Sequence, residues 1–292
     1  MITWGNKNRV VKIVTKKISK LVVKDNALIN ASCNFDLVEK RLILLAIIEA
    51  RESGKGISAK DPLIIHAESY INHFGVHRNG AYKALKDACD DIFLRQFSYQ
   101  SFSEKGNVIN HKSRWVSEVA YIENEAIVQL IFAPAVIPLI TQLEKQFTSY
   151  EIEQISELTS VYAIRLYELV ISWRATGKTP TFDVSDFRHK LGVEPDEYLR
   201  MDHFKSRVLD IAIKQINQHT DITAKYEQHK RGRSITGFSF TFKQKNAAKS
   251  LSTVKKGRQR ITKKEAEEMA YLGEEWPDLL NRLTGQYHII DM

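Results

Sequence analysis

Apolar and polar residues follow two different periods in the stretch from Tyr198 to Lys245. At about 100° per residue, one arc of a helix would collect the apolar side chains Phe204, Val208, Leu209, Ile211, Ala212, Ile213 and Ile216. The opposite arc would be polar and hold His203, Ser206, Arg207, Asp210, Lys214, Asn217 and Gln218. Apolar residues then occur at every second position, first in Ile222, Ala224 and Tyr226 and later in Phe238, Phe240 and Phe242. This pattern predicts an amphipathic helix followed by two strands.

The segment between the two predicted strands reads His-Lys-Arg-Gly-Arg-Ser, from His229 to Ser234. It holds three cations and a glycine, which favours a tight hairpin turn. A polar helix face followed by a basic hairpin is the arrangement that a winged helix presents to DNA. The polar side chains of this helix face are of the kinds that meet base edges and phosphates.

Two segments repeat in the chain at a domain-sized distance. Tyr70–Val76 matches Phe187–Val193 in pattern, and Arg41–Leu45 matches Arg165–Leu169. A repeat of this period indicates duplicated domains rather than a solenoid. The predicted fold is therefore α+β and helix-rich, with two tandem winged-helix domains related by an internal repeat and a charged C-terminal tail. We expect a basic N-terminal extension at 1–20, domains at 21–140 and 141–245, and the tail at 246–292.

The first domain contains its own helix and strand signals. Asp36 with Glu39 resembles a capping pair that opens a helix. A third helix is expected from about Arg78 to Leu94. The aromatic positions Phe97, Tyr99, Trp115 and Tyr121 are expected to mark the first hairpin, with a further strand at 126–132. Pro134 and Pro138 predict a connecting helix that reaches about Phe147.

The net charge of +8 is informative once it is localised. Residues 198–245 hold ten basic and four acidic side chains, whereas residues 25–140 hold 12 and 14. Residues 246–264 are basic and residues 265–292 are acidic, which predicts a flexible linker and a short helix from about Lys263 to Trp276, either disordered or contacting a partner. A basic segment on a slightly acidic protein favours a polyanionic partner.

Motifs for catalysis or cofactor binding are weak in this sequence. The segment Thr176-Gly177-Lys178-Thr179 resembles the end of a phosphate-binding loop, but Ser172 stands where that motif requires its first glycine. No His-x-His pair, which a nicking enzyme would use to hold its metal, occurs. Cys33 and Cys89 show no zinc-site spacing. We therefore expect no catalytic residue, cofactor or metal, and a cytoplasmic protein without a membrane segment, since the longest apolar run, 42–48, is too short to span a bilayer.

Residues 20–244 resemble the initiator replication proteins of iteron-containing, theta-replicating plasmids. The resemblance lies in Leu21–Leu28 and Glu39–Leu45 of the first domain, and in Asp202–Leu209, Ile216-Asn217 and Thr220-Asp221 of the second. It implies a bacterial, non-enzymatic protein that binds double-stranded DNA at direct repeats of a replication origin and promotes origin opening and helicase loading. It also implies a homodimer through the first domain that represses its own gene, and recruitment of host initiator and helicase proteins. The family often has a basic residue where this chain has Ser206.

The residues expected to contact DNA come mainly from the second domain. Arg207 is the favoured guanine reader because its planar guanidinium can bind in a bidentate manner, unless it pairs with Asp202 or Asp210. The full set is Arg200, His203, Lys205, Ser206, Arg207, Asp210, Lys214, Lys230, Arg231 and Arg233, with Arg78, Asn79 and Lys83 of the first domain, and less firmly Lys112 and Arg114.

Three hypotheses stay open at this point. The aromatic residues Phe97, Tyr99, Phe102, Trp115 and Tyr121 form either a dimer surface or part of the core. A plain winged-helix repressor would share every DNA-binding feature with an initiator. A nicking replication enzyme is the third functional class considered, beside an initiator and a repressor, although this sequence lacks the metal-binding motif that such an enzyme would need.

Overall fold

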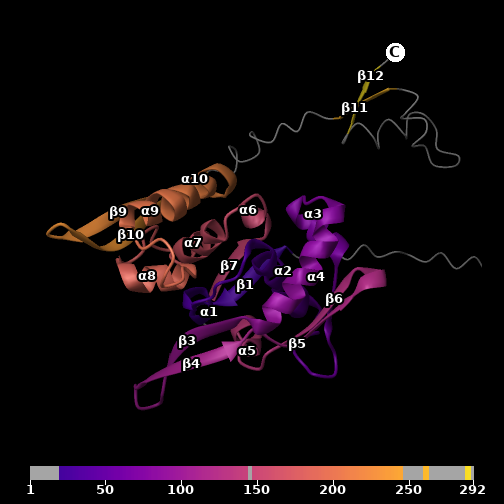
Figure 1. Cartoon of the computed structure of the whole chain (residues 1–292), viewed down its shortest axis with the longest axis horizontal. Helices are drawn as coiled ribbons and strands as arrows, with labels where there is room; N and C mark the ends of the chain where they lie inside the picture. Colours follow the sequence, from indigo (N-terminus) through magenta and orange to yellow (C-terminus); the bar gives the residue numbers. More distant parts are fainter. Residues whose placement is uncertain (1–19, 144–146, 246–258, 263–286, 291–292) are drawn as a thin grey trace, which may run out of the picture. The chain divides into compact units, whose positions relative to one another are not determined.

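The fold consists of two copies of one motif. The computed structural model describes residues 20–143, 147–245, 259–262 and 287–290. The first copy contains β1 (Leu21–Asp25), α1 (Asn26–Asn30), α2 (Leu37–Ser53), β2 (Leu63–His66), α3 (Ala67–Phe74), α4 (Arg78–Leu94), β5 (Val116–Ile122) and β6 (Ile127–Phe132). The second contains β7 (Phe147–Glu151), α6 (Glu153–Ser156), α7 (Val161–Ile171), β8 (Phe182–Asp183), α8 (Val184–Leu191), α9 (Met201–Phe204), α10 (Asp210–His219), β9 (Ile222–Arg231) and β10 (Ser234–Gln244). Figure 1 shows both copies.

Each copy has the winged-helix topology that the repeat predicted. Its three-stranded sheets have the orders β2-β6-β5 and β8-β10-β9, so corresponding strands occupy corresponding places. The hairpins β5–β6 and β9–β10 are therefore equivalent, and we call them the first wing and the second wing. The prediction of two tandem winged-helix domains is confirmed.

The first copy contains a hairpin that the second lacks. Strands β3 (Gln96–Phe102) and β4 (Val108–Arg114) form a two-stranded sheet between α4 and β5. The sequence interpretation merged β3, β4 and β5 into one hairpin and was wrong, because the wing is formed by β5 and β6 around the short helix η1 (Glu123–Glu125). Strand β5 hydrogen-bonds to β6, whereas β3 hydrogen-bonds to β4.

The predicted helix reaching Phe147 is also wrong. Helix α5 (Ile137–Thr141) is short, and Phe147 begins strand β7. Strand β7 pairs antiparallel with β1, with Val22 opposite Tyr150 and Lys24 opposite Thr148. Alternate residues of β7, Thr148 and Tyr150, are buried, which is the period of a strand.

Helix ends follow the local signals in the sequence. Asp36 caps α2 in a complete capping box with Glu39, as predicted. The matched helices α3 and α8 both end at a left-handed glycine, Gly75 with φ of 60° and Gly192 with φ of 78°. At Gly192 a Cβ atom would lie 2.2 Å from the carbonyl oxygen of Cys33, so only glycine fits this approach between the two copies.

The two copies contact each other through corresponding arginines of the repeat. Arg41 of α2 donates to the carbonyls of Ser156 and Leu158, at 2.9 and 3.1 Å. Arg165 of α7 donates in return to the carbonyls of Ile29 and Ala31, at 3.1 and 2.7 Å. Each arginine satisfies polar groups in the segment that precedes the long helix of the other copy.

A buried charge cluster lies beside these arginines. Glu168 accepts hydrogen bonds from Lys24, from Lys40 at 2.9 Å, from Arg165 at 3.0 Å and from the Tyr150 hydroxyl at 2.7 Å. Burial opposes ionisation of Glu168, but the surrounding cations hold its pKa well below the ordinary value. Burial lowers the pKa of Lys24 to about 7, against the opposing effect of Glu168. We call Lys24, Lys40, Arg165 and Glu168 the junction cluster.

The core of the second copy holds α9 against the second wing. Phe187 of α8 contacts the rings of Phe182, Phe204, Phe238 and Phe240, with centroids 5.4 to 6.2 Å apart. Phe204 belongs to the third helix and Phe238 and Phe240 belong to the second wing. One aromatic cluster therefore holds that helix and that wing together.

Residues from Gln244 onward form a separate unit. Within it, β11 (Gln259–Thr262) pairs in parallel with β12 (Tyr287–Ile290). The predicted basic extension at 1–20, apart from Lys20, and the predicted tail helix at 263–276 lie outside the described residues. In the part of the chain that the structure describes, no helix has both the length and the apolar character needed to cross a membrane.

Candidate nucleic-acid interface

The third helix of the second copy contains one wide turn. Residues Lys205–Leu209 form a π-helical segment between α9 and α10, and we refer to the whole element as helix 201–219. Phe204, Val208, Leu209, Ala212 and Ile216 are buried as predicted, but Ile211 is 42% exposed. The placement of Ile211 in the core was wrong, because each residue of a π turn advances less around the axis than an α-helical residue and shifts the later side chains.

The predicted contact residues on this helix face solvent to different degrees. Ser206, Arg207, Asp210 and Lys214 are exposed, and His203 and Lys205 are half-buried. Within residues 20–143 and 147–245, no hydrogen bond or ion pair engages the Arg207 guanidinium or the Lys214 ammonium. The suggested ion pair of Arg207 with Asp202 or Asp210 therefore does not form, and Arg207 is left available for a ligand.

Other charged side chains on or near the helix already have partners. Arg200 forms a bidentate pair with Asp202, at 3.1 and 2.7 Å. Asp202 and Arg200 are both largely exposed, so this pair is worth little in water and can be exchanged for a phosphate. Lys205 donates to the side chain of Gln228 on β9 at 3.0 Å, so it reaches toward the second wing. The Ser206 hydroxyl donates to the Asp202 carbonyl at 2.9 Å.

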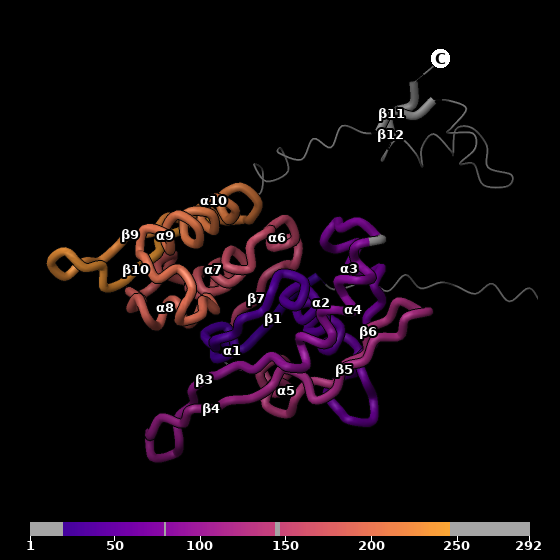
Figure 2. Tube along the Cα trace, viewed as in Figure 1, coloured from indigo at the N-terminus to yellow at the C-terminus, as the bar shows by residue number. Residues whose placement is uncertain are grey.

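The second wing carries its cations at the tip. Lys230, Arg231 and Arg233 are exposed around a turn in which Gly232 has φ of 62°. A positive φ at this position favours glycine. No ion pair within the described part of the chain neutralises these three side chains. Figures 1 and 2 show the second wing as the long hairpin β9–β10 beside helix 201–219.

On the equivalent surface of the first copy, acidic side chains outnumber basic ones. Arg78 and Lys83 are exposed on α4, and Arg78 donates to the Tyr82 hydroxyl at 2.6 Å. Asn79 lies on the same helix, but its side chain is outside the described atoms. Further along α4 the exposed residues are Asp87, Asp90 and Asp91, and the first wing turns through Glu123 and Glu125. Lys86 forms an ion pair with Glu123, so the cation nearest this wing is neutralised.

Two further first-copy residues lie on the extra hairpin rather than on the first wing. Lys112 is exposed on β4, and Arg114 donates to the Phe93 carbonyl at 2.6 Å and covers the Phe93 ring. Both residues therefore lie on a hairpin, as expected, and their contact with DNA stays a prediction.

The aromatic residues assigned to a dimer surface divide into two groups. Phe97 and Trp115 are buried, and Tyr99 stacks on Phe97 and on His111. Phe102 is 71% exposed at the end of the β3–β4 hairpin, next to the exposed Val108. Core filling explains the buried residues, whereas Phe102 and Val108 expose apolar side chains at the tip of this hairpin.

Sequence reasoning missed the contribution of strand β9. The Tyr226 hydroxyl donates to Asp210 Oδ1 at 2.8 Å, and Gln228 holds Lys205. The side chains of β9 were interpreted only as an alternating strand. The polar side chains at alternate positions of β9 could have indicated contacts with the helix. The register of β9 against the helix, however, cannot be derived from the sequence.

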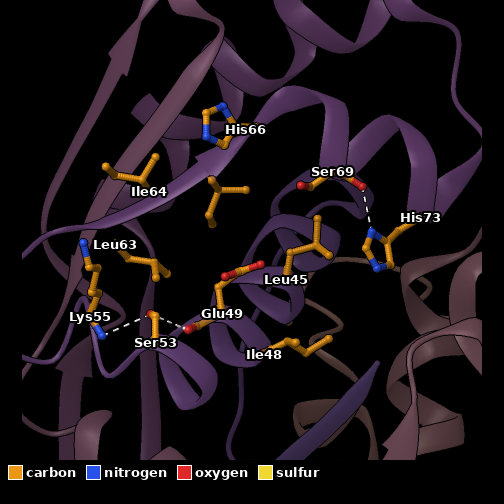
Figure 3. Close-up of a pocket in the computed structure, with 11 residues that line it drawn as sticks. Leu45, Ile48, Glu49, Ser53, Lys55, Leu63, Ile64, His66, Ser69 and His73 are labelled. Atoms are coloured by element: carbon orange, nitrogen blue, oxygen red, sulfur yellow. Dashed lines mark hydrogen bonds between the residues drawn. The ribbon is translucent and has the colours of Figure 1, made fainter. Parts of the chain in front are cut away.

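Two concave features lie away from the wing tip and the exposed face of helix 201–219. A groove of about 1030 Å³ runs between the copies and includes Arg95, Lys112, Asp183, Arg188 and Glu194, a mixture of both charges. A smaller pocket of about 330 Å³ lies between α2, β2 and α3, as Figure 3 shows. Glu49, His66 and His73 line it, but no group of three or more metal-binding side chains occurs among the described residues.

Comparisons with known proteins match both copies. Residues 21–171 match the family model described as "Initiator Replication protein, WH1", and residues 183–242 match "Initiator Rep protein, WH2". The crystal structure of Pi initiator protein in complex with iteron DNA is 21% identical, with a TM-score of 0.63, over 77% of this chain and 97% of that chain.

Two other similar proteins add little about function. An uncharacterized 27.6 kDa protein of Escherichia coli is 26% identical over 242 residues, covering 80% of this chain and 98% of that protein. The WH1 domain of MSBI1.176, a replication protein isolated from a multiple sclerosis patient, is 64% identical over 44% of this chain and 98% of that domain, with a TM-score of 0.34.

Proposed function

This chain belongs to the initiator replication protein family through both of its winged-helix domains, and from that premise we propose that it binds double-stranded DNA in a sequence-specific manner to initiate plasmid replication. The observation that carries the proposal is the set of unpaired cations on one helix and its wing. Arg207, Lys230, Arg231 and Arg233 are exposed, and no ion pair among the described residues engages them. This surface is suited to a polyanion.

In the proposed complex, helix 201–219 enters a major groove and the second wing follows the adjacent backbone. Arg207 reads a guanine, because a guanidinium can donate to O6 and N7 together. Lys230, Arg231 and Arg233 neutralise phosphates or enter a minor groove. Arg200 and Lys205 hold phosphates near the start of the helix by exchanging Asp202 and Gln228 for the DNA.

The first domain has an auxiliary role in this proposal. Arg78, Asn79 and Lys83 contact DNA at the start of α4, while the acidic residues further along keep the rest of that helix away from phosphates. The domain bounds of 21–140 and 141–245 remain predictions. The exposed apolar tip of the β3–β4 hairpin supports a homodimer formed through this domain.

The biological role follows from the family and from one neighbour. Because the Pi structure contains iteron DNA, we propose that this chain also recognises direct repeats at an origin. Origin opening, recruitment of host initiator and helicase proteins, and repression of its own gene by the dimer complete the proposal. The bacterial cytoplasm is the compartment in which these partners would occur. The chain acts by binding and positioning DNA, with no catalytic step of its own.

Binding titrations at several salt concentrations test the contact residues. Arg207→Ala should weaken binding to a cognate duplex by about 1–3 kcal/mol and relax one base position. Lys230→Ala should weaken cognate and scrambled duplexes alike and reduce the salt slope by about one unit. Equal effects of both variants on both duplexes would contradict these assignments.

A replication assay separates the initiator from a plain repressor or a nicking enzyme. The full chain is supplied in trans to a plasmid whose only origin is the DNA that the protein binds. An initiator sustains that plasmid, whereas a repressor lowers transcription from the site without sustaining replication. Nicking of the supercoiled origin in the presence of a divalent metal would favour the enzyme instead.

A further inference from the structure

Tyr226 and Asp210 connect the second wing to helix 201–219. The Tyr226 hydroxyl donates to Asp210 Oδ1 at 2.8 Å. The ring of Tyr226 packs edge-on against Phe238, with centroids 5.8 Å apart, and against Phe240 at 6.3 Å. Because these phenylalanines belong to the buried aromatic cluster, the core fixes the position of the Tyr226 hydroxyl.

The hydrogen bond leaves half of the Asp210 carboxylate free. Asp210 is exposed, and among the described residues no hydrogen bond involves its second oxygen, Oδ2. Burial, together with the Asp210 carboxylate, raises the pKa of Tyr226 to about 12, so the hydroxyl remains a donor at neutral pH. An ionised carboxylate can only accept hydrogen bonds, so its free oxygen suits a ligand that donates.

The neighbourhood of Asp210 is otherwise cationic or tied down. Arg207 lies three residues earlier on the helix and forms no ion pair with Asp210 within the part of the chain that is described. Lys205, two residues before Arg207, is bound to Gln228, two residues after Tyr226 on β9. The Lys205–Gln228 and Tyr226–Asp210 contacts thus join the helix to β9, and Arg207 lies between Lys205 and Asp210 on the helix.

A comparison within the same domain separates this pair from a purely structural one. The Tyr167 hydroxyl also donates to an aspartate, Asp221, at 2.9 Å, but Tyr167 is fully buried on α7. That pair is partly buried and joins α7 to the residue that precedes β9. Asp210 instead presents its carboxylate to solvent on the helix that carries Arg207.

We propose, on the basis of the proposed DNA-binding function, that Asp210 determines specificity by accepting from the N4 amino group of a cytosine, and that Tyr226 is the positioning residue that aims it. Cytosine is the base whose major-groove edge offers an amino donor suited to aspartate or glutamate. The same carboxylate repels phosphates, so it disfavours registers that place the backbone opposite Asp210. Tyr226 removes the rotational freedom that a solvated aspartate would otherwise have.

The test uses the full chain and DNA selected by the wild-type protein. Duplexes with a randomised central segment are enriched for binding, and each base pair of the preferred duplex is then replaced in turn. We expect Asp210→Ala to reduce discrimination at one cytosine position by about 5- to 100-fold. Tyr226→Phe should reduce discrimination at the same position by about 2- to 10-fold, the size of one hydrogen bond. The salt slope should not change in Tyr226→Phe, because this variant alters no charge.

Tyr167→Phe is the matched control, because it removes a Tyr–Asp hydrogen bond away from the exposed face of helix 201–219. It should leave the base profile unchanged, and circular dichroism confirms that each variant is folded. A wild-type profile that Asp210→Ala leaves unaltered would overturn this inference alone. This inference would also be overturned if Tyr226→Phe reduced discrimination equally at all base positions. It would be overturned as well if the base affected by Asp210→Ala were adenine. A wild-type protein without any sequence preference would overturn the proposed function as well.

Discussion

Replacing Glu168 by glutamine tests whether the junction cluster stabilises the fold. The carboxylate is the only acid among the four charged members of that cluster, and it accepts from Lys24, Lys40 and Arg165. Glutamine keeps the shape but removes the charge, which leaves three cations with no anion among them. Removing one partner of a buried ion pair costs about 3–5 kcal/mol. The free energy of unfolding of a folded protein is roughly 5–15 kcal/mol, so this cost would remove a large part of it.

Urea unfolding of the full chain, followed by circular dichroism, measures this loss. The midpoint should fall while the slope with urea stays unchanged, because the same surface is exposed on unfolding. Lys24→Met is the matched variant, since it removes one cation and leaves Glu168 with Lys40 and Arg165. We expect Lys24→Met to change stability much less than Glu168→Gln. A loss below about 1 kcal/mol for Glu168→Gln would refute the reasoning.

The pH dependence of stability in the wild type and in Lys24→Met gives a second measurement. Burial lowers the folded-state pKa of Lys24 to about 7 from an ordinary value of 10.5. Between these values the unfolded chain binds a proton that the folded chain has released, so stability rises with pH. The wild type should gain up to about 1.4 kcal/mol per pH unit relative to Lys24→Met in this window, and nothing below pH 7. A stability difference between the wild type and Lys24→Met that stayed constant from pH 7 to 10 would contradict the lowered pKa of Lys24.

Three further outcomes are expected. Gly192→Ala should destabilise the protein by more than about 2 kcal/mol, because the new Cβ would meet the backbone of Cys33. Gly75→Ala should cost only about 1 kcal/mol, because no atom lies within 4 Å of its new Cβ. Similar urea midpoints for the two variants would contradict this expectation. Phe102→Ser should shift the full chain toward monomer in sedimentation, and an unchanged distribution would exclude the hairpin tip as a dimer surface. Arg200→Ala should weaken cognate and scrambled duplexes alike, and a selective loss on the cognate duplex would instead make Arg200 a base reader.

Local signals predicted much of the fold. The capping residues Asp36 and Glu39 act through neighbouring backbone, so a short stretch of sequence is sufficient to interpret them. The repeat then related one copy to the other. The β1–β7 pair was missed because its strands are more than 100 residues apart in the chain and each is only five residues long.

The exposure of several candidate contact residues was predicted from the sequence, but their hydrogen-bond partners were not. Exposed cations such as Arg207 and Lys230 follow from periodicity and turn chemistry. The partners of Arg200, Lys205 and Asp210 depend on rotamers and on the register of β9 against the helix, which composition does not determine. The π turn shifted Ile211 out of the core because a fixed angle per residue assumes an unbroken α-helix.

The antiparallel pair of β1 and β7 has a consequence for anyone who divides this protein. A cut between the copies would strip β7 from β1 and leave an unpaired strand edge on each fragment, together with the orphaned carbonyls that Arg41 and Arg165 now satisfy. Such a fragment can pair its bare strand edge with the same edge of a second copy. An oligomer seen for the isolated first domain would then be a product of the truncation, so the natural assembly has to be measured on the intact polypeptide.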